Sequence, residues 1–301
     1  MSAHALPLRH ILLALVVVSI WGANFVAVKI ALRELPPLLL CAVRFVLTAV
    51  PLVFFLPRPA LSWSQLIIYG LTMFTLQFGF MFMGLNLGMS AGLASLILQF
   101  QVIVTLTLAA IFLKERILPV QIVGALTAMA GFAIVAVHLG GDVTVAGLVC
   151  LVLAAFSWGF GNFYSRRLGR VNPLALVAWG GLMAPLPMGL ASLALEGPAL
   201  IVESFKQVGL ATVLCVAYVV YASTHVAYSL WSWLLARHTA SVIVPFTLLV
   251  PIFGMLSSAV FLGESLPGWK FQAAALVIAG LALNLFGQRL LSSAPRAAVA
   301  R

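Results

Sequence analysis

The stretch Trp21-Gly22-Ala23-Asn24-Phe25 returns in a looser form as Trp158-Gly159-Phe160-Gly161-Asn162-Phe163. Both copies lie within long apolar segments, where an asparagine side chain is costly unless it finds a partner. A costly motif that recurs indicates an internal repeat. A second pair of similar stretches, Phe112-Leu113-Lys114-Glu115 and Phe261-Leu262-Gly263-Glu264, follows in the same order. The chain is therefore predicted to consist of two similar halves, residues 1–141 and 142–301.

The composition predicts that lipid is the solvent of this chain. Of its 301 residues, 64% are hydrophobic and only 7% are charged, whereas a soluble domain carries about 25% charged residues. The net charge of +10 comes from basic residues that stand singly between apolar runs. Nucleic-acid binding requires a clustered basic face, so no nucleic-acid partner is expected.

Ten apolar segments approach the ~20 residues that a membrane-spanning helix requires. Prolines lie at many of the proposed ends, where they disturb a helix least. The sequence thus predicts an all-α integral membrane protein with ten transmembrane helices. The expected spans are Ile11–Leu32, Pro37–Leu56, Leu66–Leu85, Gly92–Leu113, Val120–Val137, Val145–Tyr164, Leu174–Leu195, Leu210–Trp231, Ser241–Leu262 and Trp269–Leu290.

An even number of spans places both termini on one side of the membrane. Basic residues are concentrated there, and the positive-inside rule makes that side cytoplasmic. Because each half contributes five helices, the halves must insert in opposite orientations, an architecture typical of secondary transporters. The opposite side carries only Arg33, Lys206 and Lys270, with Lys29 nearby. The basic residues on the terminal side are Arg9, Arg58, Lys114, Arg116, Arg166, Arg167, Arg170, Arg237, Arg289, Arg296 and Arg301.

The order of these motifs across both halves resembles the drug/metabolite transporter superfamily, specifically its ten-helix EamA-type exporters. The stretch Gly263-Glu264-Ser265-Leu266 carries part of that resemblance. The stretches Met89-Ser90-Ala91-Gly92-Leu93-Ala94-Ser95-Leu96 and Leu98-Gln99 resemble bacterial exporters of cysteine-pathway metabolites and other amino acids. The chain departs from the pattern at Lys114, where glycine is more usual. The resemblance implies a basket of ten helices with a central cavity and efflux of small metabolites.

The repeated motif supplies the first candidate site residues, Trp21, Asn24, Trp158 and Asn162. Tryptophan offers a flat wall, asparagine can form hydrogen bonds across a cavity, and the neighbouring glycines permit close backbone approach. The alternative is structural, because small residues and amides commonly hold membrane helices together.

Three further intramembrane polar residues are candidates. Arg44 could bind the carboxylate of an amino acid by bidentate pairing; alternatively, it could extend to the lipid headgroups or bind carbonyls of a neighbouring helix. Gln77 and Gln99 are amides within predicted spans. Gln99 and Gln101 are about 200° apart on an α-helix, so we expect Gln99 rather than Gln101 to face the cavity.

The eighth span carries Tyr218, Tyr221, His225 and Tyr228, spaced by three, four and three residues. At 100° per residue these side chains share one narrow face, which we expect to line a cavity. The alternative is a buried histidine satisfied among tyrosines. Prolines interrupt the seventh and ninth spans at Pro185, Pro187, Pro245 and Pro251, where they act either as hinges or as packing kinks.

One enzyme motif is present, because Gly88-Met89-Ser90-Ala91-Gly92 fits the G-x-S-x-G pattern of hydrolases. That motif requires a strand, a sharp turn and a helix, whereas here it joins two spans. A membrane-embedded hydrolase is thus a remote alternative, and the chain is expected not to be an enzyme. No motif for ATP or zinc is found, and no cofactor or metal is expected.

The sequence therefore predicts a multi-pass protein of the bacterial inner membrane that exports amino acids or related small metabolites by alternating access. All six acidic residues lie at helix ends or in loops, and only His225 could titrate near mid-membrane. Either His225 carries a proton, or the protein is a facilitator; downhill facilitation or exchange is favoured because it needs only alternating access and the substrate's own gradient. The alternative is proton-coupled efflux of other small molecules, such as drugs or nucleotide sugars. The oligomeric state is left open.

Overall fold

The computed structural model describes residues 6–169 and 171–292. Within them the regular secondary structure is helical, apart from one isolated bridge between Gly140 and Val143. Within the described chain, nine apolar helices are long enough to cross a membrane, and a tenth, α2 (Pro37–Val53), is shorter. The predicted fold class, an all-α membrane protein with ten spans, is confirmed.

The first half supplies five spans in sequence order. Two of them are interrupted by a turn of π- or 3₁₀-helix. The elements are α1 (Leu8–Ala31), α2 (Pro37–Val53), α3 (Trp63–Gly70) with η1 (Leu71–Leu76) and α4 (Gln77–Asn86), α5 (Ala91–Ile97) with η2 (Leu98–Phe100) and α6 (Gln101–Leu113), and α7 (Pro119–Val137).

The second half repeats this pattern with more interruptions. Its elements are α8 (Val145–Arg167), α9 (Pro173–Gly181) with α10 (Pro185–Leu195), α11 (Pro198–Gln207), α12 (Leu210–Ala217) with η3 (Tyr218–Val226) and α13 (Ala227–Arg237), α14 (Ala240–Ile243) with η4 (Val244–Leu249) and α15 (Val250–Leu262), and α16 (Gly268–Ser292).

Two differences from the predicted spans have local causes. The second span was expected to reach Leu56, but α2 ends at Val53 and contains Pro51 in its last turn, where the ring removes a backbone donor. Residues 196–209 lie between two predicted spans and were expected to form a connection without a helix. They contain the short helix α11 (Pro198–Gln207), which begins directly after Gly197. Proline suits the first turn of a helix because its missing N–H would be unpaired there anyway.

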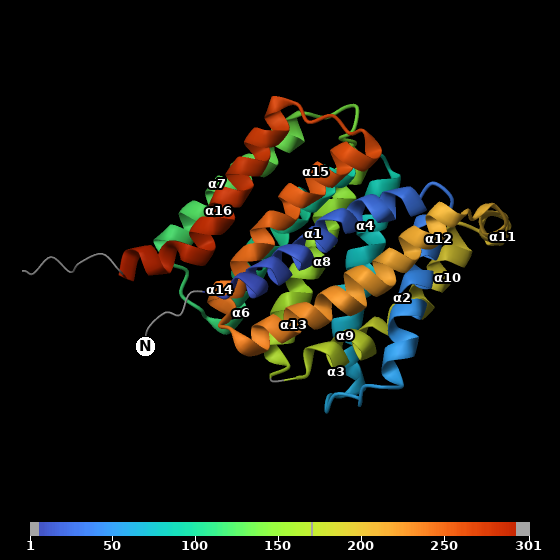
Figure 1. Ribbon diagram of the computed structural model, residues 1–301, viewed down its shortest axis with the longest axis horizontal. Coiled ribbons are helices and arrows are strands. Elements are labelled where there is room, and N and C mark those ends of the chain that lie inside the picture. Colours follow the sequence, from blue (N-terminus) through green and yellow to red (C-terminus); the bar gives the residue numbers. More distant parts are fainter. Residues whose placement is uncertain (1–5, 170, 293–301) are drawn as a thin grey trace, which may run out of the picture.

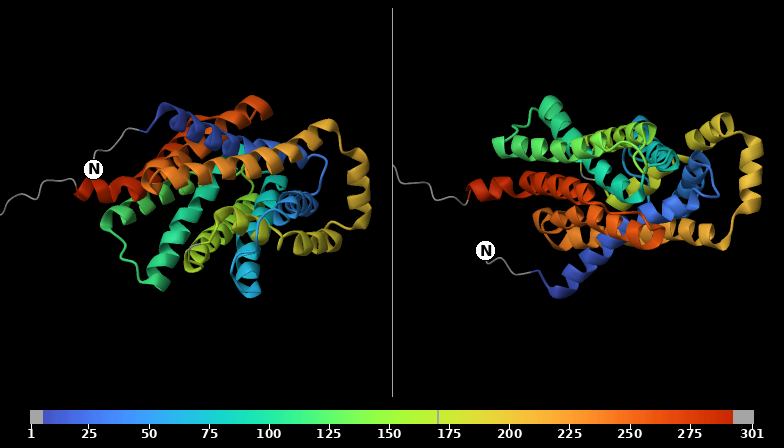
Figure 2. Two further views of the ribbon diagram at one scale, coloured as in Figure 1. Left: turned by 60° about the horizontal axis from the view of Figure 1, so that its bottom comes forward. Right: turned by 90° about the horizontal axis from the view of Figure 1, so that it is seen from above.

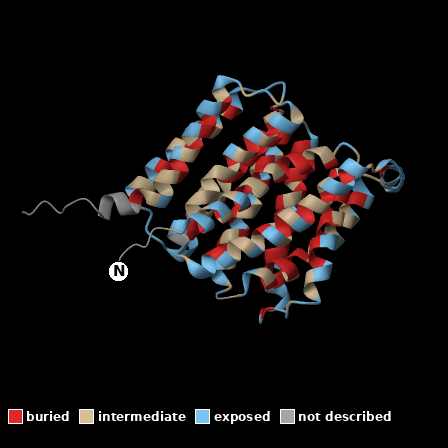
Figure 3. Cartoon of the chain, viewed as in Figure 1, coloured by how far each residue is buried: buried red, intermediate tan, exposed pale blue. Residues whose placement is uncertain are grey.

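Exposed residues lie along the outer faces of the helices (Figure 3), and many of them are large and apolar, as a lipid environment requires. Large hydrophobic side chains are exposed along these faces; Leu186, Leu210 and Val260 are 71%, 74% and 75% exposed. In water such a surface would be an aggregation liability. In a bilayer it is the surface that contacts lipid tails.

Glycines allow the helices of the two halves to approach closely. Helices α7 and α16 lie side by side (Figure 1), and a Cβ atom on Gly280 would lie 2.4 Å from the carbonyl oxygen of Gly124. Gly22 in the first repeated motif meets α15, where an added Cβ would lie 2.5 Å from Cβ of Phe253. Gly159 in the second motif meets Val104 of α6 in the same way, at 2.6 Å. The glycines of the repeated motif therefore serve helix packing.

The first turn of α1 and the last turns of α16 lie at one end of the molecule, and α11 lies at the other (Figure 2). We call the end that holds the first turn of α1 the terminal end. We call the opposite end the Asp142 end; it is formed by the connections at residues 32–36, 87–90, 138–144 and 263–267. Three basic residues used in the topology prediction, Arg170, Arg296 and Arg301, lie outside the described residues.

Candidate functional site

A cavity of about 340 Å³ lies between helices of both halves, within the size range of small-molecule sites. Seven of the eleven predicted site residues line it. They are Trp21, Asn24, Arg44, Gln77, Gln99, Trp158 and Tyr228. The wall also reaches Trp231, Thr247 and Leu285, which belong to the parts of their helices nearer the terminal end.

Arg44 is the only cationic residue among those that line this cavity in the described chain. Its side chain comes from α2 and is 4% exposed. The guanidinium carbon lies 4.0 Å from the centre of the Phe78 ring, and Nη2 lies 3.5 Å from the hydroxyl of Thr224. Nε and Nη1 have no hydrogen-bond partner. Arg44 therefore neither reaches the headgroups nor binds carbonyls of a neighbouring helix, the two alternatives to a substrate role.

Aromatic rings form one wall of the cavity. Trp21 donates its indole N–H to the carbonyl of Ser223 at 3.1 Å, which joins α1 to η3. Its ring meets Tyr228 and Trp231 edge to face, with centroids 5.4 and 5.2 Å apart. Such pairs hold the rings in fixed orientations. Trp231 was not predicted from the sequence, although it follows Tyr228 by three residues and so shares its helix face.

Glutamine and asparagine amides supply the neutral polar groups. Gln99 and Gln101 both line the cavity, so the expectation that Gln101 faces elsewhere is wrong. The cause is η2, the 3₁₀ turn at Leu98–Phe100, because a tighter turn rotates successive residues further than an α-helix does. Asn162 lies behind the wall and donates to the side-chain oxygen of Gln101 at 2.7 Å. Asn162 therefore positions a cavity residue instead of lining the cavity.

Three residues predicted from the eighth span also lie away from the cavity. Tyr218 donates its hydroxyl to the carbonyl of Ile20 at 2.8 Å. Tyr221 is 52% exposed, and its ring meets that of His225 with centroids 5.6 Å apart. Nε2 of His225 lies 3.0 Å from the carbonyl oxygen of Thr48. Of the four predicted residues on this span, only Tyr228 lines the cavity.

The single face expected for this span is broken because residues Tyr218–Val226 form the π-helix η3. A π-helix bonds each residue to the fifth one before it, so each residue advances through a smaller angle than the 100° that the prediction assumed. The hydroxyl of Thr224 shows the same spacing, because it donates to the carbonyl of Val219, five residues earlier, at 2.9 Å.

The four predicted hinge prolines lie at helix breaks. Pro185 and Pro187 open α10, directly after the chain leaves α9 at Gly181. Pro245 lies in the 3₁₀ segment η4, and Pro251 is the second residue of α15. The placement fits both earlier alternatives, hinge and packing kink.

The hydrolase motif has no strand before it, and Ser90 instead caps α5 by accepting the N–H of Leu93 at 3.3 Å.

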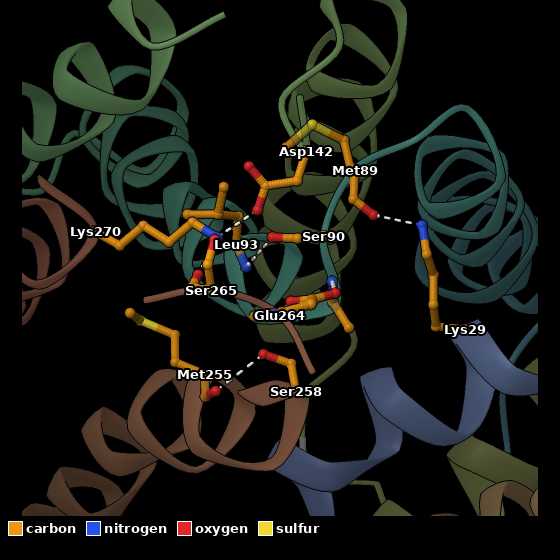
Figure 4. A network of polar contacts seen from close by, with 12 residues as sticks. Lys29, Met89, Ser90, Leu93, Asp142, Met255, Ser258, Glu264, Ser265 and Lys270 are labelled. Carbon is orange, nitrogen blue, oxygen red and sulfur yellow. Dashed lines mark hydrogen bonds and ion pairs between the residues drawn. The ribbon is translucent and has the colours of Figure 1, made fainter. Parts of the chain in front are cut away.

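A network of polar contacts lies at the Asp142 end of the molecule (Figure 4). Lys270 of α16 is 1% exposed and binds the carboxylate of Asp142. The carbonyl of Asp142 accepts the N–H of Ser90 at 3.1 Å. Lys29, at the end of α1, donates to the carbonyls of Leu85 and Met89 at 2.5 and 2.7 Å. These contacts join the start of α16, the connections at residues 138–144 and 87–90, and the end of α1 to one another.

Glu264 adds a contact between the two halves at the same end. Its carboxylate accepts the N–H groups of Ala91 and Gly92, the first residues of α5, at 2.7 and 3.2 Å. An anion is stabilised at a helix N-terminus because the N–H groups there lack intrahelical partners. The corresponding acid of the first half, Glu115, instead pairs with Arg166 at 2.6 Å on an exposed surface. The two acids therefore bind different groups at opposite ends of the molecule.

Comparisons with known proteins agree with this architecture. The sequence model of the EamA-like transporter family matches twice, at residues 8–137 and 145–286. A protein of Salmonella typhimurium strain LT2 named "Probable amino-acid metabolite efflux pump" is 39% identical over 284 residues, which cover 92% of this chain and 95% of the relative. A protein of the same name from Escherichia coli K12 is 39% identical over 283 residues, with the same coverage of both chains. A solved crystal structure with 22% identity superposes at a TM-score of 0.66 over 95% of this chain and 99% of the other, which shows a shared fold.

Proposed function

Because the chain belongs to the EamA-like transporter family, we propose that it exports amino acids or related small metabolites across the bacterial inner membrane through its central cavity. The observation that carries this proposal is the cavity itself, which both halves line and which holds one unpaired buried cation, Arg44. The names of the relatives at 39% identity support the substrate class.

The charge of the cavity favours zwitterions or anions over cations. No Asp or Glu is among the described residues that line it, and a buried cation without a counter-ion repels a second one. Cationic drugs are therefore disfavoured substrates. A nucleotide sugar carries two phosphates, which a single guanidinium would leave largely uncompensated inside the membrane.

Alternating access requires that the cavity close at one end while it opens at the other. With both termini in the cytoplasm, the Asp142 end faces the periplasm and is the closed end in this conformation. The two units that move against each other are residues 1–141 and 142–301, and the breaks at Pro185, Pro187, Pro245 and Pro251 are the places where helices can bend.

Transport runs downhill or by exchange in this proposal. Proton-coupled carriers usually keep a titratable side chain in the pathway, and among the described cavity residues there is neither a carboxylate nor a histidine. His225 contacts the Thr48 carbonyl instead. The substrate's own gradient is then sufficient to drive export.

A radiolabelled amino-acid panel in proteoliposomes tests the substrate class. We expect at least one amino acid to enter protein-containing vesicles faster than protein-free vesicles. A panel with no such member would contradict the proposal.

The orientation has its own test in a variant that lacks Cys41, Cys150 and Cys215. We expect Lys206→Cys to react with an impermeant thiol reagent in intact cells and Ala60→Cys to be protected. Both positions are exposed, so the reverse labelling pattern would place the termini outside.

A further inference from the structure

We propose that Arg44 and Asn24 form the two poles of a zwitterion site, in which the guanidinium binds the substrate's carboxylate and the Asn24 side-chain oxygen accepts its ammonium group. This inference rests on the proposed function above and adds which residue recognises which end of the substrate. It predicts that both charged groups of an amino acid are required for binding.

The case for the carboxylate pole is the uncompensated charge of Arg44. None of the ion pairs among the described residues includes it, and it is 4% exposed. A charge buried in this way is costly unless an opposite charge or several hydrogen bonds compensate it. A carboxylate supplies both, and it matches the planar donors of a guanidinium better than any neutral group.

The contacts that Arg44 does make leave its donors free. The guanidinium carbon lies over the Phe78 ring, 4.0 Å from its centre, and this cation–π contact supplies no hydrogen-bond acceptor of the kind that the N–H donors pair with. The distance of 3.5 Å to the Thr224 hydroxyl is at the outer limit for a hydrogen bond. Nε and Nη1 remain without partners in a cavity wall. Arg44 is thus held among aromatic rings, and two of its three nitrogens are buried without a hydrogen-bond partner.

The ammonium pole is Asn24. Its side chain is 6% exposed, lines the same cavity, and carries an oxygen with no hydrogen-bond partner. An unpaired buried acceptor costs about as much as a lost hydrogen bond, and an ammonium group brings three donors. The side-chain N–H of Asn162, in the equivalent motif, donates to the side-chain oxygen of Gln101 at 2.7 Å. Asn162 is not among the residues that line the cavity, so of the two motif asparagines Asn24 is the one in the cavity wall.

The choice of an amide at this pole has a physical reason. A carboxylate at position 24 would place an opposite charge in the same cavity wall as Arg44 and would weaken the attraction of Arg44 for a substrate's carboxylate. The neutral Asn24 cannot neutralise Arg44, so the guanidinium stays available for a substrate. The aromatic wall of Trp21, Trp158 and Tyr228 leaves the rest of the cavity suited to an apolar or sulfur-containing side chain.

Competition in counterflow tests this assignment on the intact protein in proteoliposomes. The labelled probe is the amino acid transported best in the panel above. The competitors are that amino acid, its primary amide, which lacks the carboxylate, and its N-acetyl derivative, which lacks the ammonium. For the wild type we expect the half-inhibitory concentration of each analogue to be about tenfold to hundredfold higher than that of the unmodified amino acid. This is the scale of losing a hydrogen bond to a charged group.

Two variants assign each loss to a residue. In Arg44→Gln we expect the amino acid and its amide to compete equally, and in Asn24→Ala we expect the penalty for N-acetylation to shrink. Arg58→Gln removes a cation outside the cavity that binds the Leu61 carbonyl, and Asn284→Ala removes another buried unpaired amide oxygen outside the cavity. Both controls are expected to keep the wild-type ratios.

The outcomes separate the two proposals. A wild type that exchanges the amino acid but accepts its amide equally well overturns the zwitterion site and leaves the exporter proposal standing. An Arg44→Gln variant that still rejects the amide overturns the role of Arg44. If Arg44→Gln does not yield monodisperse protein, Arg44→Lys, which keeps the charge, must still discriminate against the amide. A panel with no transported amino acid contradicts both proposals.

Discussion

Lys270, buried in the last helix, binds the carboxylate of Asp142 in the connection between the two halves. The same ammonium group donates to the carbonyl of Ser265 at 2.8 Å. One side chain thus joins α16 to the segment that links the repeats, at the end of the molecule that we propose is closed (Figure 4).

Removing the carboxylate should destabilise this closed end. We expect Asp142→Asn to lower the apparent Tm of the purified protein, because it leaves the buried ammonium without a counter-ion, at a cost of about 1–3 kcal/mol. The double variant Asp142→Asn/Lys270→Met should recover part of the loss, because no charge is then left unpaired. Equal Tm values for the wild type and Asp142→Asn would show that the pair contributes nothing measurable.

The close helix contacts at the repeated motif predict a sharp difference between two glycines. Gly22→Val should abolish or strongly reduce folded protein, because even a Cβ atom would lie 2.5 Å from Phe253 and 2.8 Å from the backbone nitrogen of Gly254. Gly189→Ala in α10 is the matched control, since nothing lies within 4 Å of its added Cβ. The yield of monodisperse protein in size-exclusion chromatography measures both. A normal yield of Gly22→Val would contradict the packing described here.

Glu34 predicts a pH dependence of stability. The N–H of Gly209 donates to its carboxylate at 2.8 Å, and this hydrogen bond, with one from Thr212, holds the pKa of Glu34 below its usual value. The ionised form therefore favours the folded state. That contribution is fully present above the unfolded pKa of ~4.3 and is lost as pH falls through the lower folded pKa.

Apparent Tm values of the wild type and Glu34→Gln at several pH values check this sign. The wild type should be the more stable at pH 7, and the difference should shrink as the pH is lowered below about 4. A difference that grows on acidification would reverse the assignment.

The cavity wall predicts which aromatic residues matter for transport. Trp158→Ala should reduce amino-acid flux about tenfold or more, the scale of losing a buried aromatic anchor, whereas Tyr221→Ala should leave it near the wild-type value. Trp158 lines the cavity, and Tyr221 is half exposed on the outer surface. The measurement is amino-acid flux per amount of reconstituted protein in the Trp158→Ala and Tyr221→Ala variants. Equal losses in both would contradict the assignment of this cavity as the transport pathway.

Much of the site could be predicted from the sequence because polar residues within an apolar segment are rare and costly. That argument found Trp21, Asn24 and Trp158 through the repeated motif, and Arg44 through its charge. It could not separate a residue that lines the cavity from one that supports it. Asn162 looks like Asn24 in the sequence, and only the structure shows that Asn162 bonds Gln101, the first residue of α6, and does not line the cavity.

The failures come from departures from α-helical geometry. Spacing arguments assume 100° per residue, but Gln101 follows a 3₁₀ turn and Tyr221 lies within a π-helix. Neither the 3₁₀ turn nor the π-helix can be recognised from the residues around it. Contacts with neighbouring helices decide which backbone carbonyls accept hydrogen bonds there. The predicted face of the eighth span was wrong for this reason, although the span itself was found.

The central claim is that this protein carries amino acids through the cavity without a proton gradient. Counterflow in proteoliposomes with equal pH on both sides tests it most directly, in the wild type and in His225→Asn. We predict that unlabelled amino acid inside the vesicles drives uptake of the labelled one, and that His225→Asn preserves this exchange, because His225 contacts the Thr48 carbonyl and does not line the cavity. Uptake that appears only under an imposed pH difference and is lost in His225→Asn would contradict the account.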